Sequence, residues 1–99
     1  MMEKIQEGVI VNTDDAFLAD SIKGTVIMWK ETATVSPEIS SKLCFVYSDS
    51  PGELKKLSEL KGHKVRMTYI YEDDGYADFA EQRIYMPIAR LVRVEDLGE

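Results

Sequence analysis

A short helix with a marked beginning is the feature of this sequence that most constrains the fold. Ser50 precedes Pro51, and Glu53 stands three positions after Ser50. This is the capping-box pattern, with proline at the first helical position, where its missing N–H costs nothing. Three leucines then recur at every third position, namely Leu54, Leu57 and Leu60. The pattern predicts a helix over residues 51–61 that packs through a leucine stripe.

A strand is predicted directly after this helix. Gly62 offers the left-handed conformation that commonly ends a helix. Apolar and polar side chains then alternate over residues 65–69, within a predicted strand over 64–71. Such alternation is typical of a strand with one buried face. The rest of the chain reads as strand and turn, so we expect one helix docked on a β-rich domain.

Four further strands are indicated by runs of β-branched, aromatic and apolar residues. They are predicted at residues 5–11, 25–29, 43–48 and 83–94. Pro87 lies within the last of these runs and cannot donate a ladder hydrogen bond. We therefore expect that strand to be an edge at Pro87 or to carry a bulge there.

The connections between strands carry turn residues. Residues 12–15 read as a turn that could cap one helical turn over residues 16–19. The polar connector at residues 31–42 either extends its flanking strands or forms a mobile loop, and both readings stay open. Asp74 and Gly75 form the strongest short hairpin signal, so the last hairpin turn is expected at residues 72–76.

The predicted element order is β-β-β-α-β-β. This order, with the capped helix after the third strand, resembles the OB-fold, a small five-stranded Greek-key barrel. The resemblance implies a mainly β fold: a five-stranded antiparallel Greek-key barrel with one short helix at residues 51–61. An open antiparallel sheet with one packed helix gives the same order and is the alternative. With 99 residues, we expect residues 1–99 to form a single domain.

Composition bounds the class of protein. Apolar residues make up 44% of the chain and charged residues 30%, as in an ordinary globular protein. The single cysteine, Cys44, lies in an apolar run and is expected to be a small buried hydrophobe. Neither an apolar run of about 18 residues nor an N-terminal signal-peptide core is present, so we expect a cytoplasmic protein without membrane association.

Catalysis and metal binding find little support in the residues. His63 is the single histidine and follows the predicted helix, where it can interact with the negative helix C-terminus. A calcium loop centred on Gly75 would have Ile70 at its first position, where an acid is needed. Glycines are scattered singly rather than gathered in a phosphate-binding loop. We therefore expect a non-enzymatic protein with no cofactor and no metal.

Charge is distributed unevenly along the chain, whose net charge is −6. Residues 55–66 hold five lysines and arginines against one acid, whereas residues 72–81 hold five acids and no base. An acidic loop or an edge strand suits a basic protein partner, so a protein-interaction or accessory-subunit domain is our first hypothesis. A small-ligand site inside the barrel is a third hypothesis.

The second hypothesis is a module for single-stranded nucleic acid. The OB-type barrel that the chain resembles binds single strands by stacking bases on aromatic residues in a cationic groove. Strand alternation is expected to turn Arg66 and Thr68 outward. The candidate binding residues are Trp29, Lys30, Tyr47, Lys64, Arg66, Thr68 and Tyr76. The net negative charge opposes this hypothesis, because binding to a phosphate backbone depends on cations.

Overall fold

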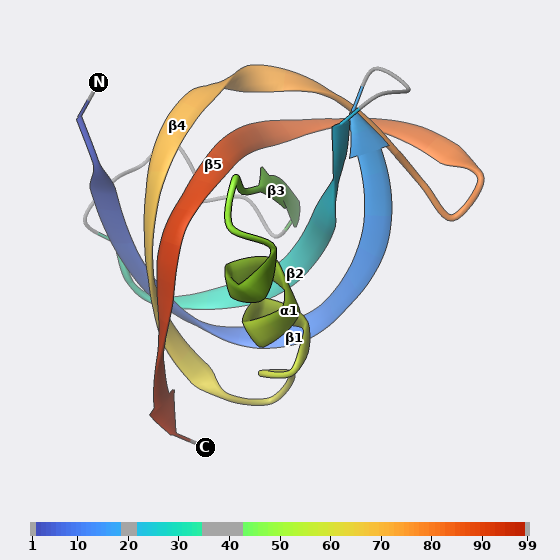
Figure 1. The fold of residues 1–99 in the computed structure, drawn as a ribbon. Coiled ribbons are helices and arrows are strands. Elements are labelled where there is room, and N and C mark those ends of the chain that lie inside the picture. The colour runs from blue at the N-terminus through green and yellow to red at the C-terminus, as the bar shows by residue number, and fades with distance from the viewer. Residues whose placement is uncertain (1, 19–21, 35–42, 99) are drawn as a thin grey trace.

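The computed structural model describes residues 2–18, 22–34 and 43–98, which form five strands and one helix (Figure 1). In chain order these are β1 (Lys4–Leu18), β2 (Ile22–Thr34), β3 (Leu43–Tyr47), α1 (Pro51–Ser58), β4 (Lys64–Phe79) and β5 (Gln82–Gly98). The strands close into a barrel in the order β1-β2-β3-β5-β4. The predicted mainly β fold, with one short helix after the third strand, is confirmed.

The sheet is mixed rather than wholly antiparallel. β1 and β2, β2 and β3, and β4 and β5 pair in antiparallel fashion. β3 runs parallel to β5, with Phe45 opposite Ile88. The expectation of an all-antiparallel sheet is wrong here, because α1 carries the chain away from β3 before the β4–β5 hairpin returns beside it. β1 closes the ring on β4, with Lys4 opposite Tyr69 and Val9 opposite Lys64.

The strands are longer than the sequence patterns indicated. β1 continues through residues 16–18, where a helical turn was predicted; the last residue of that predicted turn, Ala19, lies outside the described residues. Residues 31–34 extend β2, and the remainder of the connector, residues 35–42, also lies outside the described residues. The helix ends at Ser58 rather than at residue 61. Gly62, with φ of 86°, has the left-handed conformation that was expected of it.

The hairpin between β4 and β5 turns at Ala80–Glu81 rather than at Asp74–Gly75. Phe79 pairs with Gln82, and the two residues between them have φ of 50° and 61°. Positive φ at both central residues is the type I′ geometry that matches the twist of a two-residue hairpin. The predicted turn at residues 72–76 is wrong, because β4 shifts register between Tyr71 and Asp73 and then continues.

Pro87 lies beside that register shift. It stands opposite Asp74, immediately before Ile88, the first β5 residue that pairs with β3. Proline therefore occupies a place where the ladder changes partners, which agrees with the predicted interruption.

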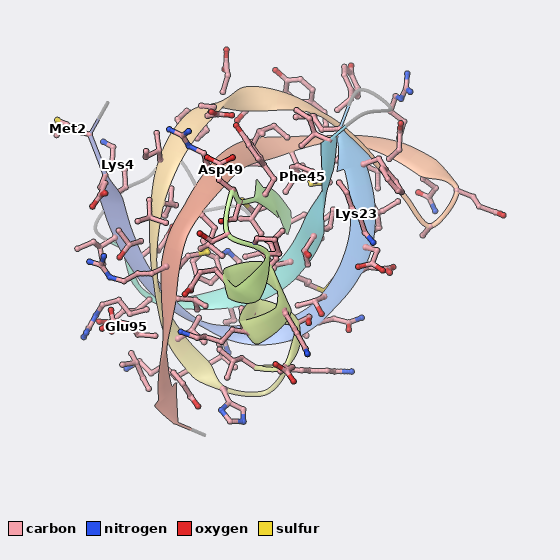
Figure 2. All side chains as sticks on the ribbon, viewed as in Figure 1. Met2, Lys4, Lys23, Phe45, Asp49 and Glu95 are labelled. Atoms are coloured by element: carbon pink, nitrogen blue, oxygen red, sulfur yellow. The ribbon has the colours of Figure 1, made fainter. Side chains whose placement is uncertain are left out.

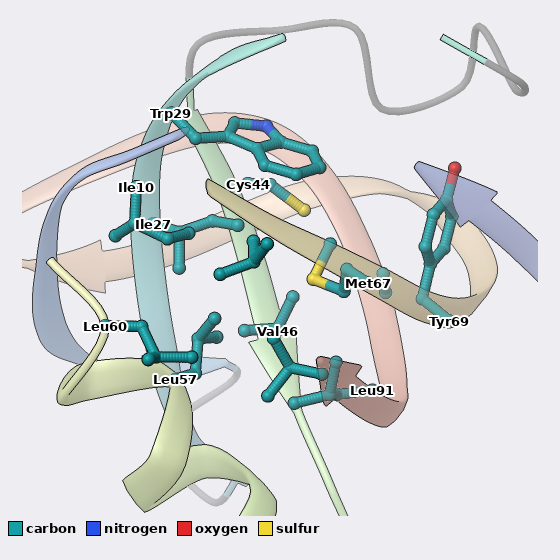
Figure 3. Packing of buried hydrophobic residues seen from close by; sticks show 13 residues of the cluster. Ile10, Ile27, Trp29, Cys44, Val46, Leu57, Leu60, Met67, Tyr69 and Leu91 are labelled. Carbon is teal, nitrogen blue, oxygen red and sulfur yellow. The ribbon is translucent and has the colours of Figure 1, made fainter. Parts of the chain in front are cut away.

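The predicted leucine stripe packs into the barrel, with Leu54 and Leu57 on α1 and Leu60 two residues beyond its end. Leu57 is fully buried and Leu60 is 7% exposed, and Leu54 packs against the same cluster. In Figure 3, Leu57 and Leu60 point toward side chains from β2 and β3, with Ile27 and Val46 nearest the middle of the cluster. The helix thus supplies the apolar plug that completes the interior of the ring.

A second apolar cluster lies on the other face of β3. Cys44 and Val46 belong to the first cluster, whereas Phe45 between them belongs to the second, because successive residues of a strand point to opposite faces. The second cluster consists of Ala16, Val26, Phe45, Ala77, Met86 and Ile88, with Leu18, Leu43, Tyr47, Phe79 and Ile84 packed against it. Phe45, labelled among the strands in Figure 2, is fully buried in this cluster.

The end of β1 meets the β4–β5 hairpin over this second cluster. Phe17 of β1 stands opposite Asp78 of β4, and Leu18 stands opposite Ala77. Figure 1 shows the β4–β5 hairpin extending beyond the ring beside the end of β1. The outer side of this hairpin is therefore held on a packed apolar base.

Candidate functional site

The outer side of the β4–β5 hairpin carries an exposed aromatic pair. Tyr76 and Tyr85 stand opposite each other in the ladder, and each side chain is 58% exposed. Their ring centroids are 5.0 Å apart in an edge-to-face arrangement. Ala77 and Met86, the next residues along each strand, point into the second cluster, so alternation turns both tyrosines to the outside. A rigid exposed tyrosine pair is well suited to contact with a partner.

Two carboxylates, Asp74 and Asp78, stand on either side of Tyr76 along β4. The Tyr71 hydroxyl donates a hydrogen bond to Asp74 at 2.7 Å. Arg83 donates two hydrogen bonds to Asp78, at 2.7 and 3.0 Å. We call the outer side of this hairpin the hairpin face; it consists of Asp74, Tyr76, Asp78, Arg83 and Tyr85. Tyr71 packs against the first cluster, and its hydroxyl reaches Asp74 from there.

Tyrosine hydroxyls hold two acids near this hairpin without cancelling their charge. Tyr47 donates to Glu72 as Tyr71 donates to Asp74. Partial burial, followed by the bond to Glu72, raises the pKa of Tyr47 to about 12. The bond to Asp74, followed by partial burial, raises the pKa of Tyr71 to about 12. Both phenols are neutral donors near pH 7, so neither brings a positive charge beside its carboxylate.

Asp78 has a different environment because it faces a cation. The hydrogen bonds from Arg83 lower the pKa of Asp78 below its ordinary value. Its charge is balanced by the guanidinium, whereas Asp74 has a neutral partner. The hairpin face therefore keeps a net negative potential.

The predicted cationic residues lie against acids from other strands. Arg66 is 2.9 Å from Glu7 and 3.9 Å from Glu95. Lys64 is 3.8 Å from the second carboxylate oxygen of Glu7. Figure 2 places Glu95 on the outside of the ring. The structure thus brings Lys64 and Arg66 together, but with their charges balanced by neighbouring carboxylates.

The other predicted site residues are distributed over the molecule. Trp29 is 2% exposed within the barrel core, and Lys30 beside it is exposed. Thr68 is 1% exposed, so the prediction that its side chain would be open to solvent is wrong. Thr68 lies inside the sheet between β1 and β5, with Ile5 and Arg93 opposite it, rather than on an edge. Tyr76 lies on the hairpin face, and Tyr47 lies at the end of β3 against Glu72.

Tyr85, Tyr71 and Asp74 were not among the candidate binding residues predicted from the sequence. Their alignment with Tyr76 depends on the hairpin turning at residues 80–81, which places Tyr76 opposite Tyr85. A turn at residues 74–75 would have separated these tyrosines. The alternation of Ile84 and Met86 with the polar residues between them was the available signal, since it fixes which face of β5 is buried.

The described residues give little basis for other site chemistry. Residues 2–18, 22–34 and 43–98 contain no group of three or more histidine, cysteine, aspartate or glutamate side chains placed to hold a metal ion. Cys44 is fully buried, and burial raises the pKa of its thiol. Within the same ranges there is no helix with the length and apolar character to cross a bilayer.

Comparison of the chain with protein-family models, with curated proteins and with solved structures finds no match.

Proposed function

We propose that this protein is a non-enzymatic binding module that recognises a basic segment of another protein through the hairpin face. One contrast carries the proposal. The cations Lys64 and Arg66 face carboxylates, whereas Asp74 on the hairpin face is held by a neutral phenol and not by a cation. Acidic charge beside exposed tyrosines suits lysine and arginine, which pair with carboxylates and lie over aromatic rings.

The barrel itself is proposed to be of the OB type. The strand order β1-β2-β3-β5-β4 and the position of α1 between β3 and β4 support this assignment. The free, buried thiol of Cys44 fits a reducing compartment, so a cytoplasmic location is part of the same proposal. An accessory subunit that joins a larger assembly through one protruding hairpin is the role that fits these features best.

Binding of two labelled probes tests this function. The first is a fluorescein-labelled peptide of alternating leucine and lysine with one central arginine, and the second is labelled oligothymidine. We expect the peptide to bind in low salt and to lose affinity as salt is raised, and the oligothymidine to bind much more weakly. Tighter binding of the oligothymidine would favour the nucleic-acid hypothesis and contradict the proposal.

A double variant locates the binding surface. Tyr76→Ser with Tyr85→Ser removes both exposed rings and should weaken peptide binding by about tenfold. The matched control is Val11→Ser with Met28→Ser, which removes two other exposed apolar side chains, 46% and 42% exposed, from β1 and β2. If the tyrosine variant and the wild type bind the peptide with equal affinity, the hairpin face is not the binding surface and the proposal is wrong.

A further inference from the structure

A pocket of about 490 Å³ lies where the end of β1 meets the β4–β5 hairpin. It is lined by Asp15 and Phe17 of β1 and by residues 78–83, which include the hairpin turn. Phe17 is 46% exposed, and Phe79 is half-buried with its ring packed against the second apolar cluster. The pocket therefore offers aromatic surface supported by a packed base.

Negatively charged side chains outnumber positively charged ones around this pocket. Three carboxylates line it, from Asp15, Asp78 and Glu81, against the single guanidinium of Arg83. Arg83 is held by two hydrogen bonds to Asp78, so these two charges balance each other. Asp15 and Glu81 are exposed and form no ion pair with any residue that the structure describes. Two carboxylates that form no ion pair among the described residues thus line the pocket together with two phenylalanine rings.

We propose that this pocket binds an arginine side chain of the partner, an inference that rests on the proposed function. A guanidinium is planar and weakly hydrated, so it stacks on an aromatic ring more readily than an ammonium group does. Phe17 supplies an exposed ring, and Asp15 and Glu81 supply the opposing charge. The pocket adjoins the hairpin face through Asp78 and Arg83, which belong to both.

Charge also argues against a second copy of this chain as the occupant. The chain carries a net charge of −6, and two acidic hairpin tips brought together would repel each other. A basic segment with one arginine beside apolar residues satisfies both the pocket and the tyrosine pair.

The test compares the arginine peptide described above with a twin that carries citrulline at the central position. Citrulline keeps the shape of arginine and loses the charge. We expect the wild-type protein to bind the arginine peptide about five- to tenfold more tightly than the citrulline twin. Asp15→Asn and Phe17→Leu should each reduce that ratio to about two or below, with the thermal unfolding midpoint measured to confirm folding. Asp14→Asn, an exposed neighbour outside the pocket, is the control and should leave the ratio unchanged.

The outcomes separate the two proposals. If both peptides bind equally and Asp15→Asn has no effect, while the Tyr76/Tyr85 variant still weakens both, the pocket assignment is wrong and the proposed function stands. If neither peptide binds in low salt, the proposed function is wrong and the arginine pocket falls with it.

Discussion

The backbone N–H of Val94 donates a hydrogen bond to Glu53 Oε2 at 3.0 Å, which ties α1 to β5. Lys56, one turn further along α1, donates to the Val94 carbonyl oxygen at 3.0 Å. β3 pairs with β5 only over residues 88–90, so Val94 lies beyond the end of that ladder. Two side chains of α1 therefore provide hydrogen-bond partners for the N–H and the carbonyl oxygen of Val94, at an edge of β5 that no described strand covers.

Removing the Glu53 carboxylate should destabilise the fold. Val94 is fully buried, and Glu53→Ala leaves its N–H without a partner, so we expect a loss of about 1–3 kcal/mol in the free energy of unfolding. Glu53→Gln keeps an acceptor oxygen and should lose less. Ser50→Ala is the control: the Ser50 side chain makes no capping hydrogen bond, so its loss should be below about 0.5 kcal/mol. A larger loss for Ser50→Ala than for Glu53→Ala in urea denaturation would restore the capping-box interpretation.

Leu57 tests whether the helix is docked. Leu57→Ala opens a cavity beneath α1 and should lower the free energy of unfolding by about 2–5 kcal/mol. Leu54→Ala, at a half-buried position of the same stripe, should lower it less. Denaturation curves that coincide for wild type and Leu57→Ala would show that the helix does not close the barrel.

We expect that substitutions in the turn at residues 80–81 can stabilise the folded protein. Ala80 and Glu81 have positive φ, which strains residues with a Cβ. Replacing them by Asn and Gly, as Ala80→Asn with Glu81→Gly, should raise the free energy of unfolding by about 1 kcal/mol.

Gly75 provides the control for the turn position. A Cβ added at Gly75 would lie 3.4 Å from Ile88 Cγ1, within ordinary contact distance. Gly75→Ala should therefore change stability by less than about 0.5 kcal/mol. Strong destabilisation by Gly75→Ala, with no gain from the 80–81 change, would indicate a turn at residues 74–75 instead.

The phenols of Tyr47 and Tyr71 make stability depend on alkaline pH. Each has a pKa of about 12 in the folded protein, above the ordinary value of 10.0, so the unfolded chain releases these protons first. The contribution of the two protonated phenols to the free energy of unfolding is complete below about pH 10 and is lost as pH rises through about 12. An ultraviolet titration of phenolate should show the step near pH 12 diminished in Tyr47→Phe and in Tyr71→Phe. An unchanged step in both variants would contradict the two hydrogen bonds.

Local sequence signals predicted the helix better than the hairpin. The leucine stripe was readable because a spacing of three residues along a short segment needs no knowledge of distant strands. The Asp74–Gly75 signal failed because pairing of Ala77 and Phe79 with β5 keeps apolar residues on one face and extends β4 past it. The prediction that Glu53 caps the helix was wrong, because its carboxylate instead accepts a hydrogen bond from the buried N–H of Val94, 41 residues away on β5.

The candidate site depended still more on distant contacts. Arg66 meets Glu7, 59 residues earlier in the chain, and no local pattern announces that pairing. The positive charge of Arg66, expected to line a cationic groove, is thereby balanced by a carboxylate. Tyr85 can be recognised as the partner of Tyr76 only when the position of the hairpin turn is known. The sequence shows the sign of each charged side chain, but it does not show which opposite charge lies beside it in the fold.

Amide chemical shifts measured during titration with the arginine peptide test the central claim most directly. We expect the perturbed amides to be concentrated in residues 73–85 and at residues 15–17, with residues 64–68 little changed. Perturbations concentrated at residues 64–68 and Lys30, or spread evenly over the barrel, would contradict recognition through the hairpin face.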